Sequence, residues 1–110
     1  LRRAAPTSEA AARFSFGDIE IDTQTREVHK AGQELRLTAK EFDLLTFLAG
    51  NPRRVFGRDQ LMSRVWGYEA ALDTGTVTVH VRRLREKIET EPSEPLHLQT
   101  VWGVGYRLVP

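Results

Sequence analysis

Residues 73–89 read DTGTVTVHVRRLREKIE, and the rest of the predicted fold is arranged around this segment. On a helix that turns about 100° per residue, four apolar residues fall on one narrow stripe, namely Val77, Val81, Leu84 and Ile88. A helix with one such stripe buries it against other helices. Asp73 or Thr74 can cap its start by accepting hydrogen bonds from unpaired backbone N–H groups. We therefore expect a helix over residues 73–89.

The other faces of this helix present small side chains first and arginines next. No acidic residue occurs between Thr74 and Arg85, so the first three turns carry neutral groups, one histidine and three arginines. Small side chains let a helix approach base edges in duplex DNA, and arginines reach guanine edges or phosphates. The alternative is an ordinary solvated amphipathic helix, because charged runs usually mean only that. The helix alone leaves both interpretations open.

Composition narrows the class of protein. A chain of 110 residues, 40% of them apolar, is long enough for one domain with a modest core. The absence of cysteine excludes a disulfide framework and a thiolate metal site. No segment reaches the roughly 18 apolar residues of a membrane span, so we expect a cytoplasmic protein. The net charge of +1 is too small for a general polyanion binder, so any affinity for nucleic acid must come from local placement of basic residues.

The first half of the chain predicts a linker, a small sheet and a helix. Residues 1–12 lack a sustained period and fit an interdomain linker, which leaves 13–110 as one domain. From 14 to 37 apolar residues alternate, which predicts four short antiparallel strands around 14–16, 19–21, 28 and 35–37. This sheet has one apolar face, and we expect the next helix to cover it.

That next helix has a clear start and end. Thr38 and Glu41 form a T-x-x-E capping box, with Leu37 and Phe42 placed as the hydrophobic staple around it. Residues 50–52, Gly-Asn-Pro, end the helix, because Gly or Asn can take the left-handed conformation and Pro cannot continue it.

The second half predicts two further helices and a hairpin. Val55-Phe56 is a candidate strand, and a helix follows over 58–66 with Leu61, Met62 and Val65 inward. After the helix of residues 73–89 comes an acidic turn bounded by prolines, then two β-type runs, 97–101 and 106–109, around a Gly-containing reversal. The order predicts an α+β winged helix-turn-helix, whose second helix enters the major groove. This order favours DNA binding.

Several blocks of the sequence resemble the OmpR/PhoB-type effector domain of bacterial two-component response regulators, from about Phe14 to the C-terminus. They are LTAKEFDLL (37–45), RDQL (58–61), VWG (65–67), TVTVHVRRLREKI (76–88) and TVWGVGYR (100–107). The resemblance implies an N-terminal four-stranded antiparallel sheet, three helices and a C-terminal hairpin wing. Residues 1–3 then match the end of a receiver domain in the same full-length chain.

The resemblance also implies site residues. Four match positions that face bases or adjacent backbone in the groove: Thr76, Val79, His80 and Arg83. Six match backbone contacts from the recognition helix, the helix before it and the wing: Arg82, Arg85, Arg58, Trp66, Thr100 and Tyr106. The loop Gly67, Tyr68, Glu69, Ala70, Ala71 and Leu72 matches one that in some members touches RNA polymerase.

Each assignment has a plainer alternative. Arg83 or Arg85 can instead pair with Glu86 or Glu89 at the surface. Trp66 ends a helix, where an indole is usually part of the core. Tyr106 can brace the wing rather than touch DNA.

Two positions depart from the family pattern. Gly75 stands where many members carry a longer, often basic, side chain, and Trp102 stands at the wing tip where an Arg commonly probes the minor groove. The loss of both cations predicts a smaller salt dependence of DNA binding than in relatives. Trp102 is then free to pack on its own domain or on a neighbouring copy.

The resemblance implies sequence-specific binding of double-stranded DNA that regulates transcription, on direct repeats, with a second protomer, RNA polymerase and an upstream sensor kinase as partners. The alternative function is a winged-helix protein-interaction module without DNA binding. An enzyme is disfavoured, because the chain has no phosphate loop or nucleophile–base arrangement, and its three histidines have no metal-ligand spacing. We expect no catalytic residue, metal or cofactor.

Overall fold

The computed structural model describes residues 13–67 and 75–110. The described residues form two compact units, which divide between Arg36 and Leu37. Three expectations lie outside the described residues: the linker and receiver tail at 1–12, the helix cap at Asp73 or Thr74, and most of the loop after Gly67.

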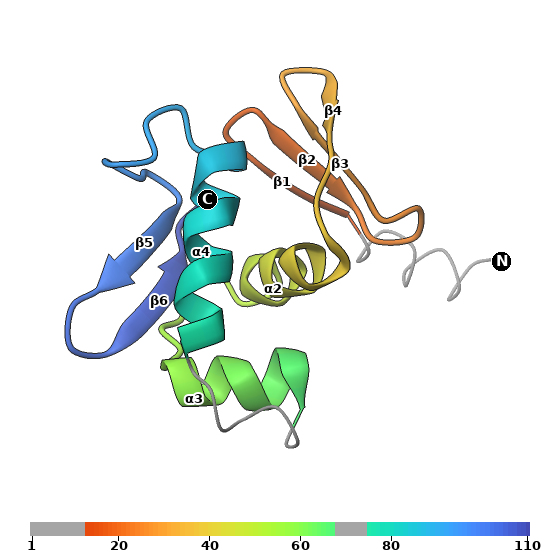
Figure 1. Ribbon diagram of the computed structural model, residues 1–110. Helices are drawn as coiled ribbons and strands as arrows, with labels where there is room; N and C mark the ends of the chain where they lie inside the picture. Colours follow the sequence, from red (N-terminus) through yellow and green to blue (C-terminus); the bar gives the residue numbers. More distant parts are fainter. Residues whose placement is uncertain (1–12, 68–74) are drawn as a thin grey trace, which may run out of the picture. The chain divides into compact units, whose positions relative to one another are not determined.

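The first unit is a four-stranded antiparallel sheet with the order β1-β2-β3-β4 (Figure 1). Its strands are β1 (Arg13–Phe16), β2 (Ile19–Asp22), β3 (Glu27–Lys30) and β4 (Gln33–Leu35). The four predicted strands are confirmed, but the last one ends two residues earlier than expected. Leu37 lies outside the sheet because it directly precedes the N-cap of the next helix.

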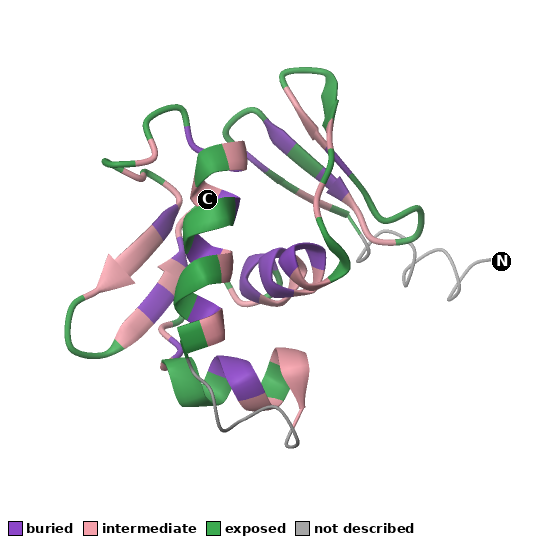
Figure 2. Ribbon diagram, viewed as in Figure 1, coloured by how far each residue is buried: buried purple, intermediate pink, exposed green. Residues whose placement is uncertain are grey.

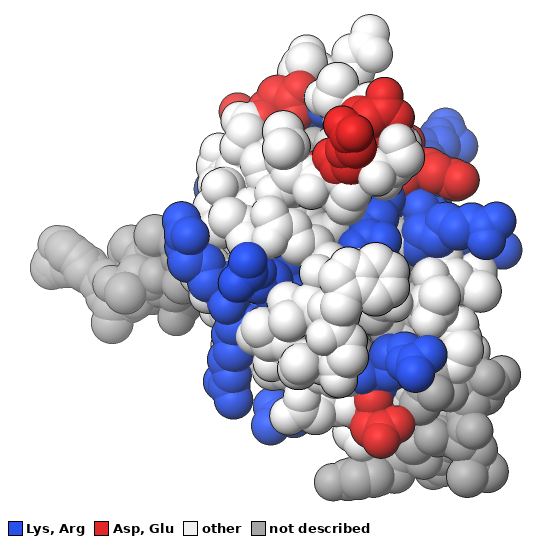
Figure 3. Space-filling model, turned by 90° about the vertical axis from the view of Figure 1, so that its left-hand side faces the viewer, with Lys and Arg blue, Asp and Glu red and all other residues white. Residues whose placement is uncertain are grey.

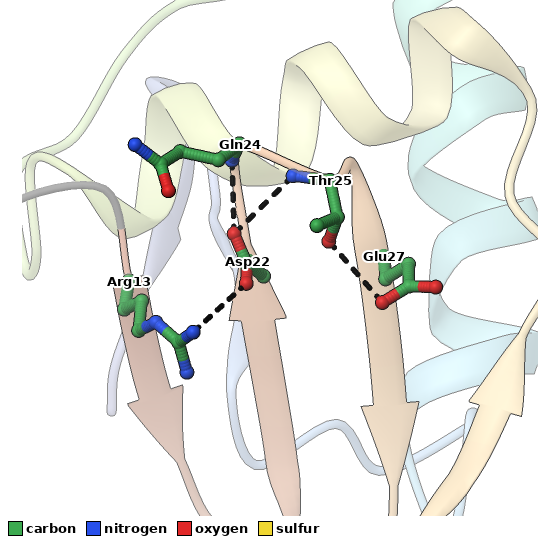
Figure 4. Close-up of polar contacts among 5 residues, drawn as sticks. All are labelled: Arg13, Asp22, Gln24, Thr25 and Glu27. Atoms are coloured by element: carbon green, nitrogen blue, oxygen red, sulfur yellow. Dashed lines mark hydrogen bonds and ion pairs between the residues drawn. The ribbon is translucent and has the colours of Figure 1, made fainter. Parts of the chain in front are cut away.

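The turn between β2 and β3 is built on one carboxylate (Figure 4). Oδ1 of Asp22 accepts hydrogen bonds from the backbone N–H groups of Gln24, at 2.9 Å, and Thr25, at 3.3 Å. Its Oδ2 pairs with the guanidinium of Arg13 at 3.2 Å. This arrangement is an Asx-type turn, in which a side chain satisfies backbone donors that the ladder leaves unpaired.

The second unit begins with α2 (Ala39–Ala49), and its predicted capping box is confirmed. The backbone N–H of Glu41 donates to Oγ1 of Thr38 at 3.2 Å, and the N–H of Thr38 donates to Oε1 of Glu41 at 3.0 Å.

The predicted left-handed end of α2 at Gly50 or Asn51 is wrong. Gly50 keeps a right-handed φ of −75°, and Asn51 is absent from the described residues with positive φ. The side-chain amide of Asn51 instead donates to the carbonyl of Phe47 at 2.8 Å, which satisfies a carbonyl that a left-handed cap would otherwise serve. The chain turns later, at Arg53, where φ is +68°.

Two more helices follow. The predicted helix over 58–66 is present as α3 (Arg58–Leu61) and one turn of π-helix, η1 (Met62–Trp66). The predicted long helix is α4 (Gly75–Ile88), whose buried residues are the expected stripe, Val77, Val81, Leu84 and Ile88. Exposed residues follow the other side of α4 in Figure 2.

The predicted hairpin is formed by β5 (Leu98–Val101) and β6 (Gly105–Leu108). The candidate strand at Val55-Phe56 is a single bridge to β6, with hydrogen bonds of 2.9 Å in both directions between the backbones of Phe56 and Tyr106. The chain before α3 is therefore joined to the hairpin.

An ion pair ties the start of α2 to the end of α4. Nζ of Lys87 lies 2.6 Å from Oε1 of Glu41, whose side chain is 1% exposed. Burial raises the pKa of the Glu41 carboxyl, but hydrogen bonds from Lys87 and Thr38 and the positive charges of Lys87 and His80 outweigh burial and lower that pKa overall.

The two glycines of the hairpin predict different costs of substitution. A Cβ at Gly105 would lie 1.9 Å from the carbonyl oxygen of Phe56, whereas a Cβ at Gly103 meets nothing within 4 Å. We expect Gly105→Ala to break the Phe56 bridge and cost more than about 3 kcal/mol of unfolding free energy. Gly103→Ala should cost only about 1 kcal/mol, from its φ of +80°. Urea unfolding of both variants tests this, and equal losses would contradict it.

The Glu41 pair predicts an acid-sensitive contribution to stability. Because the folded-state pKa is lowered, the stabilisation is complete above the unfolded value of about 4.3 and is lost as pH falls through the folded value. Glu41→Gln keeps an acceptor for Thr38 and removes only the charge. We expect it to cost about 1–2 kcal/mol at pH 7 and less as pH falls below about 4.3. Thermal unfolding across pH, with the exposed Glu86→Gln as control, measures the difference; a constant gap would contradict it.

Candidate nucleic-acid interface

The outward face of α4 carries the predicted sequence of small and then basic side chains. Thr78 and Val79 are exposed near its start, and Arg82 and Arg83 are exposed one turn later. Within residues 13–67 and 75–110, neither arginine has a hydrogen bond or ion pair, so the pairing of Arg83 with Glu86 or Glu89 is not found. Both guanidinium groups are available to an external anion.

His80 and Trp66, predicted on different helices, lie together. Their rings meet edge to face with centroids 5.0 Å apart. Nδ1 of His80 lies 2.8 Å from the carbonyl of Thr76, so Nδ1 is the donor of this hydrogen bond and Nε2 is left for another partner. Trp66 is half-buried, which agrees with a bracing role, and its contact fixes the ring of His80 beside the outward face of α4.

Arg85 points to the hairpin rather than to solvent. Its Nε donates to the carbonyl of Leu98 at 2.9 Å, and an Nη donates to the hydroxyl of Thr100 at 2.6 Å. The guanidinium also lies 5.8 Å from the ring centroid of Tyr106. Burial lowers the pKa of Arg85, and Tyr106 and the charge of Glu89 oppose that shift. Three predicted site residues therefore contact one another within the domain.

Glu89 is buried, although its charge predicts a surface residue. As a possible ion-pair partner of Arg83 or Arg85 it was expected at the surface, but it is 5% exposed. Its carboxylate accepts three backbone hydrogen bonds, from Leu96 at 2.8 Å, His97 at 3.0 Å and Leu98 at 2.7 Å. A carboxylate at a helix C-terminus is unfavourable by itself, and these three donors offset that cost. The sequence signal for this role was the position of Glu89, four residues after Arg85 and just before the acidic turn.

The hairpin completes this surface (Figure 3). Tyr106 is 9% exposed and Thr100 is half-buried, whereas Arg58 at the start of α3 is exposed. Lys and Arg side chains form separate groups in this view, and Asp and Glu side chains lie beside some of them. A hollow between α3 and the hairpin turn is lined by Arg58, Thr100, Val101, Trp102, Gly103, Val104, Gly105 and Tyr106.

The described residues bear on three other features: the loop of residues 67–72, a metal site and a membrane span. Of the loop 67–72, only Gly67 is described, and it has a φ of +95°. Within the described part of the chain, no cluster of His, Asp and Glu fits a metal ion, and no helix has the length and apolarity that crossing a membrane requires.

Comparison with known proteins decides the family. Residues 32–108 match the family model described as transcriptional regulatory protein, C terminal. The chain belongs to this family. It is 49% identical, over 102 residues, to the DNA-binding response regulator MtrA of Mycolicibacterium smegmatis, and this match covers 93% of the chain and 45% of MtrA. The chain spans about half the length of the curated relatives that it matches.

Solved structures confirm the predicted winged helix-turn-helix fold. The response regulator DrrB of Thermotoga maritima, an OmpR/PhoB homologue, has a TM-score of 0.83 at 33% identity over 90% of this chain and 45% of DrrB. The DNA-binding domain of Klebsiella pneumoniae RstA, solved with the RstA box, has a TM-score of 0.79 at 33% identity. That match covers 89% of this chain and 97% of the RstA domain.

Because Glu89 holds the start of the hairpin, substitutions of Glu89 and of the nearby Glu86 should change the stability of the domain by different amounts. Glu89→Ala leaves three backbone N–H groups without their acceptor, so we expect a loss of about 2–3 kcal/mol of unfolding free energy. Glu86→Ala removes an exposed carboxylate one turn earlier and should change stability by less than about 0.5 kcal/mol. Hydrogen exchange at the amides of residues 96–98 should accelerate only in Glu89→Ala. Unchanged exchange there would show that the carboxylate does not hold this segment.

Proposed function

We propose that this chain is the effector domain of a two-component response regulator and regulates transcription by sequence-specific binding of double-stranded DNA. In this proposal α4 enters the major groove and the hairpin lies on the adjacent backbone or minor groove. The observation that carries it is the outward face of α4, where small side chains precede two arginines, Arg82 and Arg83, without partners among the described residues.

The family relationship supports the same function. MtrA is named a DNA-binding response regulator, and the RstA domain was solved with the RstA box. A winged fold also serves protein interaction, so the fold alone does not select DNA. The arginines on α4 favour a polyanion.

Within this proposal the site residues have different tasks. Arg82 and Arg83 provide the charge for phosphates or guanine edges, and Thr76 and Val79 allow close approach, with Val79 suited to a thymine methyl group. His80 and Trp66 offer hydrogen-bonding atoms to the backbone, as does Arg58. The wing is held in place by Arg85, Thr100 and Tyr106. Of these, Thr100 and Tyr106 contact DNA, and only at the edge of the interface.

The wider assembly follows from the same proposal. A receiver domain in the full-length chain, controlled by a sensor kinase, would regulate this domain. Two protomers would bind direct repeats in tandem, and the loop of residues 67–72 would approach RNA polymerase. The cytoplasm is the compartment that such partners require, and no membrane contact is proposed.

Selection from a random duplex DNA pool tests the function. Enrichment of two direct half-sites one helical turn apart would support specific tandem binding, and one half-site would support DNA binding without pairing of the isolated domain. A folded domain that enriches nothing at low salt would overturn the proposal in favour of a protein-interaction module.

We expect each of the two exposed arginines of α4 to contribute to the affinity for DNA. Arg82→Ala and Arg83→Ala should each weaken binding to the selected duplex by about 1–3 kcal/mol. Each lost phosphate contact should reduce the slope of log affinity against log salt by about 0.9. Arg26→Ala, an exposed arginine in the β2–β3 turn of the sheet, removes the same charge and should change neither quantity much. Equal effects of all three variants would show that only net charge matters.

A further inference from the structure

Trp102 is held away from its own domain. It lies in the turn between β5 and β6 and is 89% exposed, so packing of its ring on the described part of its own domain is not found. The turn itself is ordered by a hydrogen bond of 2.9 Å from the N–H of Val104 to the carbonyl of Val101. A large indole on a fixed turn, beside a Val104 that is 61% exposed, is an apolar contact surface without a partner among the described residues.

The surroundings of this indole favour a polyanion. Trp102 lines two hollows, which also share Thr100 and Tyr106. The first includes Arg82 and Arg85 of α4, with Glu86 as its acidic residue, and the second includes Arg58 of α3. Arg58 and Arg82 are exposed and have no partner among the described residues. The apolar ring therefore lies between cationic groups of the proposed DNA interface and is continuous with it.

We propose that Trp102 packs on the deoxyribose sugars along the minor groove beside the bases that α4 reads. This inference rests on the proposed function. Sugars are the apolar part of the DNA backbone, and an indole has a large apolar surface with one N–H donor for an adjacent oxygen. Phosphates on either side of the sugars then meet Arg58 and Arg82. A second copy of this chain fits less well, because it would have to cover both arginines with acidic groups.

A contact that an indole makes at this position should depend on salt differently from a contact that a cation makes there. A cation at the wing tip releases counterions when it binds, so its contribution falls as salt rises. Packing of an uncharged ring on sugars releases none. The contribution of Trp102 to affinity should therefore be the same at low and at high salt.

Binding of the selected duplex by Trp102→Ala, Trp102→Arg and wild type, measured from 50 to 300 mM KCl, tests the inference. We expect Trp102→Ala to weaken binding about 5- to 30-fold at every salt concentration with an unchanged slope. Trp102→Arg should steepen the slope by about 0.9. Leu96→Ala is the matched control, because Leu96 is 69% exposed and lines neither hollow. It should leave both quantities unchanged, and none of these exposed substitutions should alter thermal unfolding.

Comparing a duplex that has one half-site with a duplex that has two distinguishes the possible partners of Trp102. If Trp102→Ala keeps full affinity for one half-site and lowers only cooperativity on two, the ring contacts a second copy and the inference is wrong. Unchanged binding to both duplexes would also overturn it, while the proposed function would stand if Arg83→Ala still weakens binding. Absence of specific binding by the wild type would instead overturn the proposed function, and this inference with it.

Discussion

The geometry of the second unit depends on how the backbone of Leu98 is held, by Arg85 of α4 and by Glu89, the residue that directly follows α4. The carbonyl of Leu98 accepts from Nε of Arg85 at 2.9 Å, and its N–H donates to Oε2 of Glu89 at 2.7 Å. Arg85 and Glu89 are four residues apart, so they project from the same side of consecutive turns. The hairpin therefore begins at a fixed position along α4. Binding groups on the helix and on the wing can then act as one preorganised surface.

This interaction also divides the basic residues of α4 into two kinds. Arg85 donates to the hairpin backbone and to Thr100, and its burial is offset by these bonds and by Tyr106. Arg82 and Arg83 remain exposed. A run of arginines that looks uniform in sequence thus provides both the support for the wing and the charge for an external anion. The bridge between Phe56 and Tyr106 joins the segment before α3 to the same hairpin, so Arg58 is placed relative to both.

Local patterns predicted most of the fold. The apolar stripe of α4 and the capping box of Thr38 depend on contacts three or four residues apart, and such spacing can be read directly from a sequence. Long-range partners could not be read in this way. Glu89 has the charge of a surface residue, and only the return of residues 96–98 gives it three donors. The position at which α2 ends was predicted correctly, but the left-handed conformation expected there was wrong, because Asn51 satisfies a carbonyl through its side chain. The resemblance supplied positions for DNA contacts, but not the commitment of Arg85 to the wing.

A crystal structure of the domain on its selected duplex would show whether α4 and the wing keep their mutual contacts when they bind DNA. If the wing and α4 bind DNA as one surface, Arg85 will keep its hydrogen bonds to the Leu98 carbonyl and the Thr100 hydroxyl, and Glu89 will keep the three amides. Arg82 and Arg83 will then contact the DNA. The account is contradicted if Arg85 has turned to a phosphate and the start of the hairpin has left Glu89, because the wing would then be positioned by the DNA and not by the helix.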